Sequence, residues 1–156
     1  MSKLGQPAPS FKLYNHKKEE VALETFRGKK VVLAFFPASF TKVCEKELCT
    51  FRDSLASLNS LNAAVFGVSV DAPFSNAGFA EKNQLNFPIL SDYTRSTVRA
   101  YEVAHDDFAG MPGYTAAKRS VFVIDSQGNV AYEWIAPNPG VEPDYAAVQK
   151  AVEAAS

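Results

Sequence analysis

Cys44 and Cys49 are the only cysteines in the chain, and the residues before them could support thiol chemistry. Thr41 lies three residues before Cys44, and Pro37 lies four residues before Thr41. A thiol reacts as its thiolate, and a free cysteine has a pKa of roughly 8.5, so a reactive cysteine needs a neighbour that stabilises the anion. This cluster predicts a reactive thiol with a second thiol close by.

Two features of the sequence could stabilise a thiolate at Cys44. If a helix begins near Lys42, Cys44 lies in its first turn, where unpaired backbone N–H groups favour negative charge. Arg119, which opens a predicted strand, is the best candidate for a cation that bonds both the thiolate and a substrate oxygen. Because parallel strands place neighbouring ends together, we expect Arg119 to reach the turn that carries Cys44. A solvated surface charge is the alternative role for Arg119.

Thr41 and Pro37 each have a structural and a chemical interpretation. The hydroxyl of Thr41 could cap the helix, which is the commoner use of such a residue. It could also bond a small oxygen-bearing ligand beside the sulfur. Pro37 ends a strand, and it could in addition shield the sulfur from bulk water.

Two carboxylates, Glu45 and Glu47, flank the thiol. Carboxylates suit a helix N-terminus, but their charge also opposes thiolate formation. We therefore expect Arg119 or Lys42 to offset them if Cys44 ionises readily.

The spacing of the cysteines limits how they could pair. Five residues of helix give a rise of about 7.5 Å and a rotation of about 140°, which puts the two Cα atoms roughly 8.6 Å apart. A disulfide spans at most about 7 Å between Cα atoms without backbone movement. Either Cys44 and Cys49 never pair, or the first turns of the helix unwind when they do. We expect the second, because an isolated helical turn is only marginally stable.

The elements that must position these residues alternate between strands and helices. Apolar runs and turn signals predict strands over residues 31–36, 63–70, 87–90, 121–125 and 130–135, the last two forming a hairpin. Helical stripes and capping residues predict helices from about Lys42 through Leu58, from Asp71 to about Gln84, from Asp92 to Tyr101, and from Asp144 to about Ala154. Residues 1–29 form an N-terminal arm with short strands at best. This order predicts an α/β, thioredoxin-like three-layer sandwich, with a mixed central sheet and helices on both faces.

Composition bounds the class of protein. The 156 residues fit one domain, residues 1–156, with a sizeable core. The net charge of −1 implies no broad basic face for nucleic acid, and no apolar run is long enough to span a membrane. The first residues lack the apolar core of a signal peptide, so we expect a cytoplasmic protein. In a reducing cytosol, cysteine pairs are more often catalytic or redox-active than structural.

Two other classes of function remain open. A thiol–disulfide oxidoreductase on the same fold is the main alternative, but the Cys-x4-Cys spacing counts against it. Cys44, Cys49, His16 and His105 could nominally supply four zinc ligands. A helical spacing of five does not converge two sulfurs on one ion, and the histidines lie in separate predicted loops. We therefore expect neither a metal nor another cofactor.

The pattern Pro37-x-x-x-Thr41-x-x-Cys44 resembles the active-site motif of the peroxiredoxins, and Arg119 matches the active-site arginine of that family. The match at these positions is specific, because a thioredoxin-type reductase would show Cys-x-x-Cys instead. Similar segments cover nearly the whole chain: residues 5–11, 69–74, 87–92 and 143–148.

This resemblance implies a peroxidase that reduces hydrogen peroxide and organic hydroperoxides. Cys44 would attack the terminal oxygen of the peroxide and become a sulfenic acid. Thr41 and Arg119 would position the peroxide and stabilise the charge on the leaving oxygen, and Pro37 would shield the intermediate. Glu47 matches a Glu or Gln that is common three residues after the attacking cysteine.

Cys49 matches the resolving cysteine of the Q-type, or bacterioferritin-comigratory, branch, five residues along the same helix. It would condense with the sulfenic acid to form an intramolecular disulfide, which a thioredoxin-like or other thiol reductant would reduce. Val43 and Glu45 depart from the Gly and Thr that usually flank the first cysteine in this branch. Residues 73–74 and 143–145 resemble the one-cysteine AhpE-like branch instead. The two branches imply a monomer or a homodimer.

Overall fold

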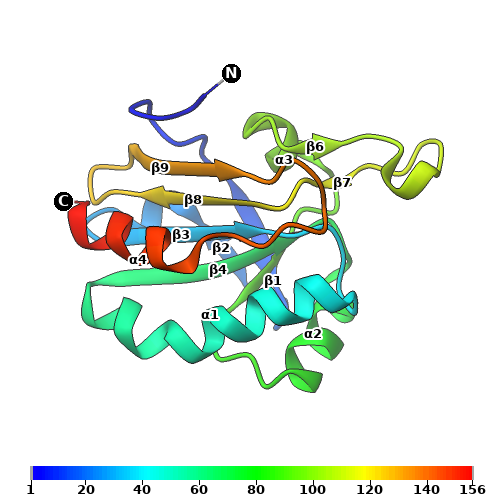
Figure 1. Cartoon of the computed structure of the whole chain (residues 1–156), viewed down its shortest axis with the longest axis horizontal. Helices are drawn as coiled ribbons and strands as arrows, with labels where there is room; N and C mark the ends of the chain where they lie inside the picture. Colours follow the sequence, from blue (N-terminus) through cyan, green and yellow to red (C-terminus); the bar gives the residue numbers. More distant parts are fainter. Residues whose placement is uncertain (1, 156) are drawn as a thin grey trace.

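The computed structural model describes residues 2–155, and a mixed β-sheet forms the centre of the fold (Figure 1). Its strands are β1 (Lys12–Asn15), β2 (Glu20–Ala22), β3 (Lys30–Phe35), β4 (Ala63–Ser69), β5 (Ile89–Ser91), β8 (Ser120–Ile124) and β9 (Val130–Ile135). They lie in the order β2-β1-β5-β4-β3-β8-β9. A separate ribbon pairs β6 (Ala104–His105) with β7 (Ala116–Ala117), and the chain between them projects from the body of the molecule in Figure 1.

Helices cover both faces of this sheet. They are α1 (Lys42–Ser60), α2 (Pro73–Lys82), α3 (Ser96–Ala100) and α4 (Tyr145–Ala154), with short 3-10 turns η1 (Leu23–Phe26) and η2 (Phe108–Gly110). Buried side chains of α1, α2 and α4 join one hydrophobic cluster, whereas α3 contributes to the cluster on the opposite face. The predicted α/β sandwich with a mixed sheet and helices on both faces is therefore confirmed.

The centre of the sheet explains where the reactive segment lies. Every residue of β3 after Lys30 is buried, as expected for a strand covered on both faces. β3 pairs with β4 in parallel and with β8 in antiparallel orientation, with Phe35 opposite Ser120. Arg119 does reach the thiol, but we expected a parallel pair of strands to bring it there, and that reason is wrong. Because β8 runs against β3, the residue before β8 lies beside the end of β3.

Some of the predicted helix starts and caps are confirmed in the structure, and others are not. α1 begins at Lys42 as expected, and the Asp144 side chain caps α4 by accepting a hydrogen bond from the Ala147 N–H. The predicted cap at Asp71 is wrong, because Ala72 occupies the N-cap position of α2. The Asp71 carboxylate instead accepts a hydrogen bond from the backbone N–H of Ser39.

The helix expected from Asp92 starts later and is shorter. It begins at Ser96, because Arg95 adopts a left-handed conformation with a φ of 65° that ends the preceding turn. The buried Asp92 carboxylate still accepts hydrogen bonds from the backbone N–H groups of Thr97 and Val98 in the first turn. Asp92 thus stabilises the predicted helix from outside it.

The sequence did not predict β6 and β7, whose two residues each carry too little pattern to detect. Among the described residues, no helix combines the length and apolar character needed to cross a membrane.

Candidate active site around Cys44

Cys44 lies in the first turn of α1, where the chain has just left the end of β3. Together with Leu48, Phe51 and Leu58 it forms the buried stripe of α1, so the helical period points its side chain at the sheet. The sulfur is fully buried. This position in the first turn places the thiol near unpaired backbone N–H groups, as the sequence predicted.

The guanidinium of Arg119 holds the centre of the site. Its Nη2 donates a hydrogen bond to Cys44 Sγ at 3.1 Å. Its Nη1 donates to Glu47 Oε1 at 2.7 Å, and its Nε donates to the carbonyl of Pro139 at 3.1 Å. Three acceptors around one rigid fork fix the plane of the guanidinium. The structure thus brings Arg119 beside Cys44, and only 2% of Arg119 is exposed.

Charge at the site is shared between Arg119, Glu47 and the sulfur. Burial opposes the positive charge of Arg119, but Glu47 and Cys44 together outweigh burial and raise its pKa. Burial also raises the pKa of Glu47 to about 7, against the attraction of Arg119. Glu47 Oε2 is buried and finds no hydrogen-bond partner among the described residues. Burial and Arg119 thus act on the pKa of Glu47 in opposite directions, and burial dominates.

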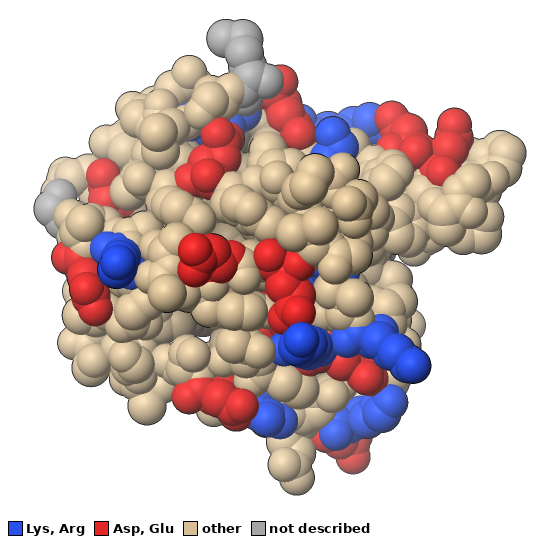
Figure 2. Space-filling model, viewed as in Figure 1, with Lys and Arg blue, Asp and Glu red and all other residues tan. Residues whose placement is uncertain are grey.

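The second carboxylate, Glu45, is paired by a residue that sequence reasoning missed. Lys82 of α2 lies 3.0 Å from Glu45 Oε1, so the offsetting cation at this position is not Lys42. Figure 2 shows basic and acidic side chains interspersed over the end of the molecule where α1 begins and α2 lies. No sequence signal could have identified Lys82, because the pair depends on how α2 packs beside α1.

Thr41 stands at the N-cap of α1, but its hydroxyl does not cap the helix. The Oγ1 donates instead to the carbonyl of Ala38 at 3.0 Å, within the loop that precedes α1. Phe40 in this loop has a φ of 65°, and this left-handed residue turns the chain sharply before the helix. The predicted capping role is therefore wrong. The bond to Ala38 uses the hydroxyl proton and leaves the oxygen able to accept a hydrogen bond.

Pro37 follows the buried end of β3 and is itself buried. It stands at the start of the loop that carries Thr41, as the sequence predicted for a residue that ends a strand.

Cys49 lies on another side of α1. It is partly exposed, and its Sγ donates a hydrogen bond to Asn83 Oδ1 at 3.5 Å. Both cysteines are free, and α1 runs unbroken through the two positions. In an unbroken helix the two Cα atoms are roughly 8.6 Å apart, which is too far for a disulfide.

The nominal zinc ligands do not converge. The structure contains no group of three or more His, Cys, Asp or Glu side chains within residues 2–155 that could hold a metal ion. His16 Nδ1 accepts a hydrogen bond from the backbone N–H of Ile89 at 3.1 Å. The ring of His105 packs edge-on against Phe108, with 5.1 Å between the ring centres. Each histidine thus has its own local partner.

A cavity of about 400 Å³ adjoins Arg119. Its apolar wall consists of Ile135, Ala136, Pro137 and Pro139. Lys118, His105 and Asn138 supply the remaining side chains of its lining. The cavity therefore combines an apolar wall with the same arginine that contacts Cys44.

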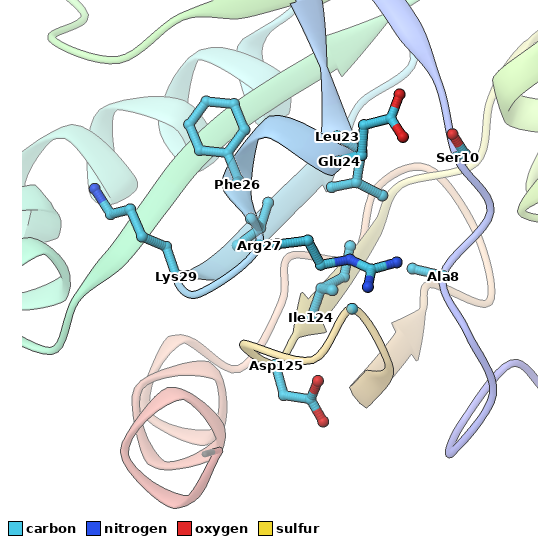
Figure 3. Close-up of a pocket in the computed structure, with 11 residues that line it drawn as sticks. Ala8, Ser10, Leu23, Glu24, Phe26, Arg27, Lys29, Ile124 and Asp125 are labelled. Carbon is cyan, nitrogen blue, oxygen red and sulfur yellow. The ribbon is translucent and has the colours of Figure 1, made fainter.

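A smaller cavity, of about 100 Å³, lies elsewhere (Figure 3). Arg27 extends into it between Ala8 and Ile124, and Lys29, just before β3, also lines it. Since Cys44 follows the opposite end of β3, this cavity lies at the far end of the sheet and is not part of the site.

Comparison with known proteins places this site in a family. The sequence profile of the AhpC/TSA family matches residues 4–133. A Bcp peroxiredoxin of Haemophilus influenzae is 38% identical over 128 residues, which are 81% of this chain and 82% of that protein. Peroxiredoxin Bcp of Bacillus subtilis is 36% identical over 131 residues, which are 84% of this chain and 83% of that protein.

A solved structure agrees over most of its length. The bacterioferritin comigratory protein of Xanthomonas campestris, a structure described for its alkyl peroxide reduction activity, superposes with a TM-score of 0.82 and 25% sequence identity. The match covers 92% of this chain and 90% of that chain.

Proposed function

The chain belongs to the AhpC/TSA family and is a peroxiredoxin, a thiol-dependent peroxidase, and we propose that Cys44 is the thiol that attacks the peroxide. The observation that carries this assignment is the 3.1 Å contact between Arg119 Nη2 and Cys44 Sγ. A guanidinium at this distance stabilises a thiolate, which is the reactive form of cysteine. The relatives favour peroxide reduction over the thiol–disulfide oxidoreductase that the sequence left open.

The proposed reaction uses groups already in place. The Cys44 thiolate attacks the terminal oxygen of the peroxide, the O–O bond breaks, and Cys44 becomes a sulfenic acid. The terminal oxygen keeps its proton in the sulfenic acid, and the leaving oxygen takes up a proton from water and departs as water or an alcohol. Arg119 stabilises the charge that develops on the leaving oxygen, and Thr41 Oγ1 accepts a hydrogen bond from the O–H of the bound peroxide. Pro37 covers the sulfur during these steps.

Both hydrogen peroxide and organic hydroperoxides are proposed substrates. The Xanthomonas campestris relative described for alkyl peroxide reduction supports the organic class. The cavity of about 400 Å³ beside Arg119 supports it independently, because its apolar wall suits the organic part of such a substrate.

Recycling of the sulfenic acid is proposed to use Cys49. The two residues would form an intramolecular disulfide with loss of water, after the start of α1 unwinds. A thiol reductant then restores both thiols, and we propose a thioredoxin-like protein for this step. Glu47 supports the first cysteine by holding Arg119 from its other side, with 2.7 Å between Nη1 and Oε1.

The location and assembly state belong to the same proposal. Both cysteines are free in the structure, and they must be reduced before each turnover, which suits the reducing cytoplasm. We propose a monomer or a homodimer that binds neither nucleic acid nor membrane. Light scattering of the reduced protein at several concentrations distinguishes the two assembly states.

Substitution of the two cysteines tests the chemistry. We expect Cys44→Ser to abolish peroxide consumption in stopped-flow measurements with hydrogen peroxide and with an organic hydroperoxide. Cys49→Ser is the matched control: it should complete one turnover and then stall with a reductant that requires a disulfide. Mass spectrometry of the oxidised wild-type protein should show a loss of two hydrogens that maps to a Cys44–Cys49 bond. Wild-type turnover in Cys44→Ser would refute the assignment, and sustained thioredoxin-dependent cycling of Cys49→Ser would refute the resolving role.

A further inference from the structure

One face of α2 contacts the reactive segment at successive points. Asn76, Phe79 and Lys82 follow one another at a spacing of three residues, and Asn83 is the C-cap residue that comes next. Residues at this spacing share one face of a helix. Each of the four contacts a residue between 39 and 49, so α2 lies along the segment that must unwind before the cysteines can pair.

The first contact holds the loop before α1. Ser39 Oγ donates to Asn76 Oδ1 at 3.0 Å, and the Ser39 N–H donates to Asp71 Oδ2 at 2.7 Å. Asn76 is fully buried, and its Oδ1 also accepts from Ser69 Oγ at 2.9 Å. A buried amide with such partners is costly to displace, so Ser39 has a firm anchor.

The middle contacts hold the turn around Cys44 without touching the sulfur. The rings of Phe79 and Phe40 meet edge to face, with 5.5 Å between their centres. Lys82 Nζ lies 5.7 Å from the centre of the Phe40 ring and 3.0 Å from Glu45 Oε1. One lysine thus links the loop to the first turn of α1.

The last contact holds the second thiol. Asn83 Oδ1 accepts the hydrogen bond of Cys49 Sγ at 3.5 Å, and the Asn83 carbonyl accepts from Arg52 Nη1 at 2.7 Å. Both Cys49 and Arg52 belong to α1. Unwinding of α1 toward Cys44 would carry Cys49 away from Asn83, because the two cysteines lie on different sides of the intact helix.

We propose that α2 is a clamp that keeps residues 39–49 in the reactive conformation, with Lys82 and Asn83 as positioning residues that set how fast the Cys44 sulfenic acid pairs with Cys49. The inference rests on the proposed resolving role of Cys49. The sulfenic acid has two fates. It condenses with the Cys49 thiol to form the disulfide and water, or it reacts with a second peroxide to form a sulfinic acid and water or an alcohol. A tighter clamp slows the first fate and leaves more time for the second.

The expected change in the rate of disulfide formation follows from the contacts with α2 that break when the start of α1 unwinds. The hydrogen bond between Cys49 and Asn83 exists only in the wound state, so its removal increases the population of the unwound state. A thiol is a weak donor, so this bond corresponds to about a twofold change in such an equilibrium, at the low end for a hydrogen bond, and an exposed ion pair such as Lys82 with Glu45 also to about a twofold change.

Rapid-quench mass spectrometry of the full chain tests the clamp. After one equivalent of hydrogen peroxide, disulfide formation should be about twofold faster in Asn83→Ala and in Lys82→Ala than in wild type. At excess peroxide, a smaller fraction of each variant than of wild type should become sulfinic acid. Glu81→Gln, an exposed change on the same helix, is the matched control and should match wild type. Equal disulfide rates in all four proteins would overturn the proposal.

Hydrogen exchange of the reduced proteins gives a second readout that needs no oxidation. Amides of residues 45–49 should exchange about twofold faster in Asn83→Ala, whereas those of residues 54–60 in the same helix should not change. A merely structural loss of stability would speed exchange in both halves of α1, and that outcome would also overturn the clamp. If wild type itself forms no disulfide, the resolving role of Cys49 fails instead, and unchanged protection at residues 45–49 then disproves the clamp separately.

Discussion

At the scale of single residues, the site depends on how one guanidinium is divided among its acceptors. Arg119 serves the Cys44 sulfur, the Glu47 carboxylate and a backbone carbonyl at the same time. An ionised Glu47 neutralises part of the positive charge of Arg119 that would otherwise stabilise the Cys44 sulfur. The same carboxylate also orients the arginine. A buried carboxyl group with a pKa of about 7 therefore stands where its protonation affects the thiol directly.

Replacement of Arg119 by lysine tests the importance of geometry over charge. Lysine keeps the positive charge but lacks the planar fork that reaches three acceptors. We expect Arg119→Lys to lower the rate constant for reaction with peroxide by about 100-fold or more, the scale seen when one stabilising donor is removed from an active site. Stopped-flow measurement of the first turnover gives this constant. Arg27→Lys, the same change in the distant cavity, should react as fast as wild type; a similar loss in both variants would contradict the assignment.

Glu47 predicts a pH dependence of stability. Its ordinary pKa is 4.5, whereas burial in the folded protein raises the pKa to about 7. Between these values the unfolded chain releases a proton that the folded protein keeps, so rising pH favours unfolding. Over this interval we expect the free energy of unfolding of wild type to fall relative to that of Glu47→Gln, by roughly 3 kcal/mol at most. Urea unfolding of both proteins across this pH range measures the difference, and a constant difference would contradict the prediction.

At the scale of elements, the reactive segment is set by the packing of α1 against the sheet and beside α2. Gly67 of β4 allows this close approach, because a Cβ added there would lie 3.3 Å from Phe36 and 3.5 Å from Leu48. The inner side of α1, which in its first turns carries Cys44, Glu47 and Leu48, is fixed by burial against the sheet and by Arg119. The other side of these turns is held by polar contacts from α2 to Glu45 and Cys49. Pairing of Cys44 with Cys49 requires both sets of contacts to break at the start of α1.

Disulfide formation should therefore reduce the helix content of the protein. We expect the helical signal in far-UV circular dichroism to fall by the equivalent of about two turns when Cys44 and Cys49 pair. Cys49→Ser, oxidised with one equivalent of peroxide, should keep its full helical signal. An unchanged signal in wild type after mass spectrometry has located the Cys44–Cys49 bond would mean that pairing occurs without unwinding.

At the scale of the whole molecule, one sheet separates two hydrophobic clusters and belongs to both. β3 shows this plainly, since Leu33 and Phe35 join one cluster while Val32 and Ala34 join the other. The alternation follows from the period of a strand, whose successive side chains point to opposite faces. Neither cluster can lose its strands without exposing the other, so we propose that residues 1–156 form a single domain.

A single domain should unfold in one cooperative step. We expect urea unfolding followed by Trp134 fluorescence and by far-UV circular dichroism to give coincident transitions. Trp134 packs against the cluster that contains α1, α2 and α4, whereas circular dichroism reports on the whole chain. Two separated transitions, or a fluorescence change that precedes the loss of secondary structure, would show that the clusters unfold independently.

Local patterns in the sequence determined much of this structure. The run before Pro37 and the stripe from Cys44 to Leu58 predicted β3 and α1, because strand and helix periods are visible in neighbouring residues. The cap at Asp144 followed from the chemistry of helix ends, whereas the predicted cap at Thr41 does not form. The spacing of Pro37, Thr41 and Cys44 pointed to the family that the relatives confirm.

The sequence named Arg119 as a partner of Cys44, but only the tertiary structure shows the antiparallel pairing of β8 with β3 that brings it there. The packing of α2 beside α1, which brings Lys82 to Glu45 and Asn83 to Cys49, was decided by the tertiary structure alone. Such partners depend on the order of strands and the side on which a helix packs, and these are properties of contacts between elements far apart in the chain. Periodicity and capping depend only on neighbouring residues, so they cannot predict contacts between distant elements.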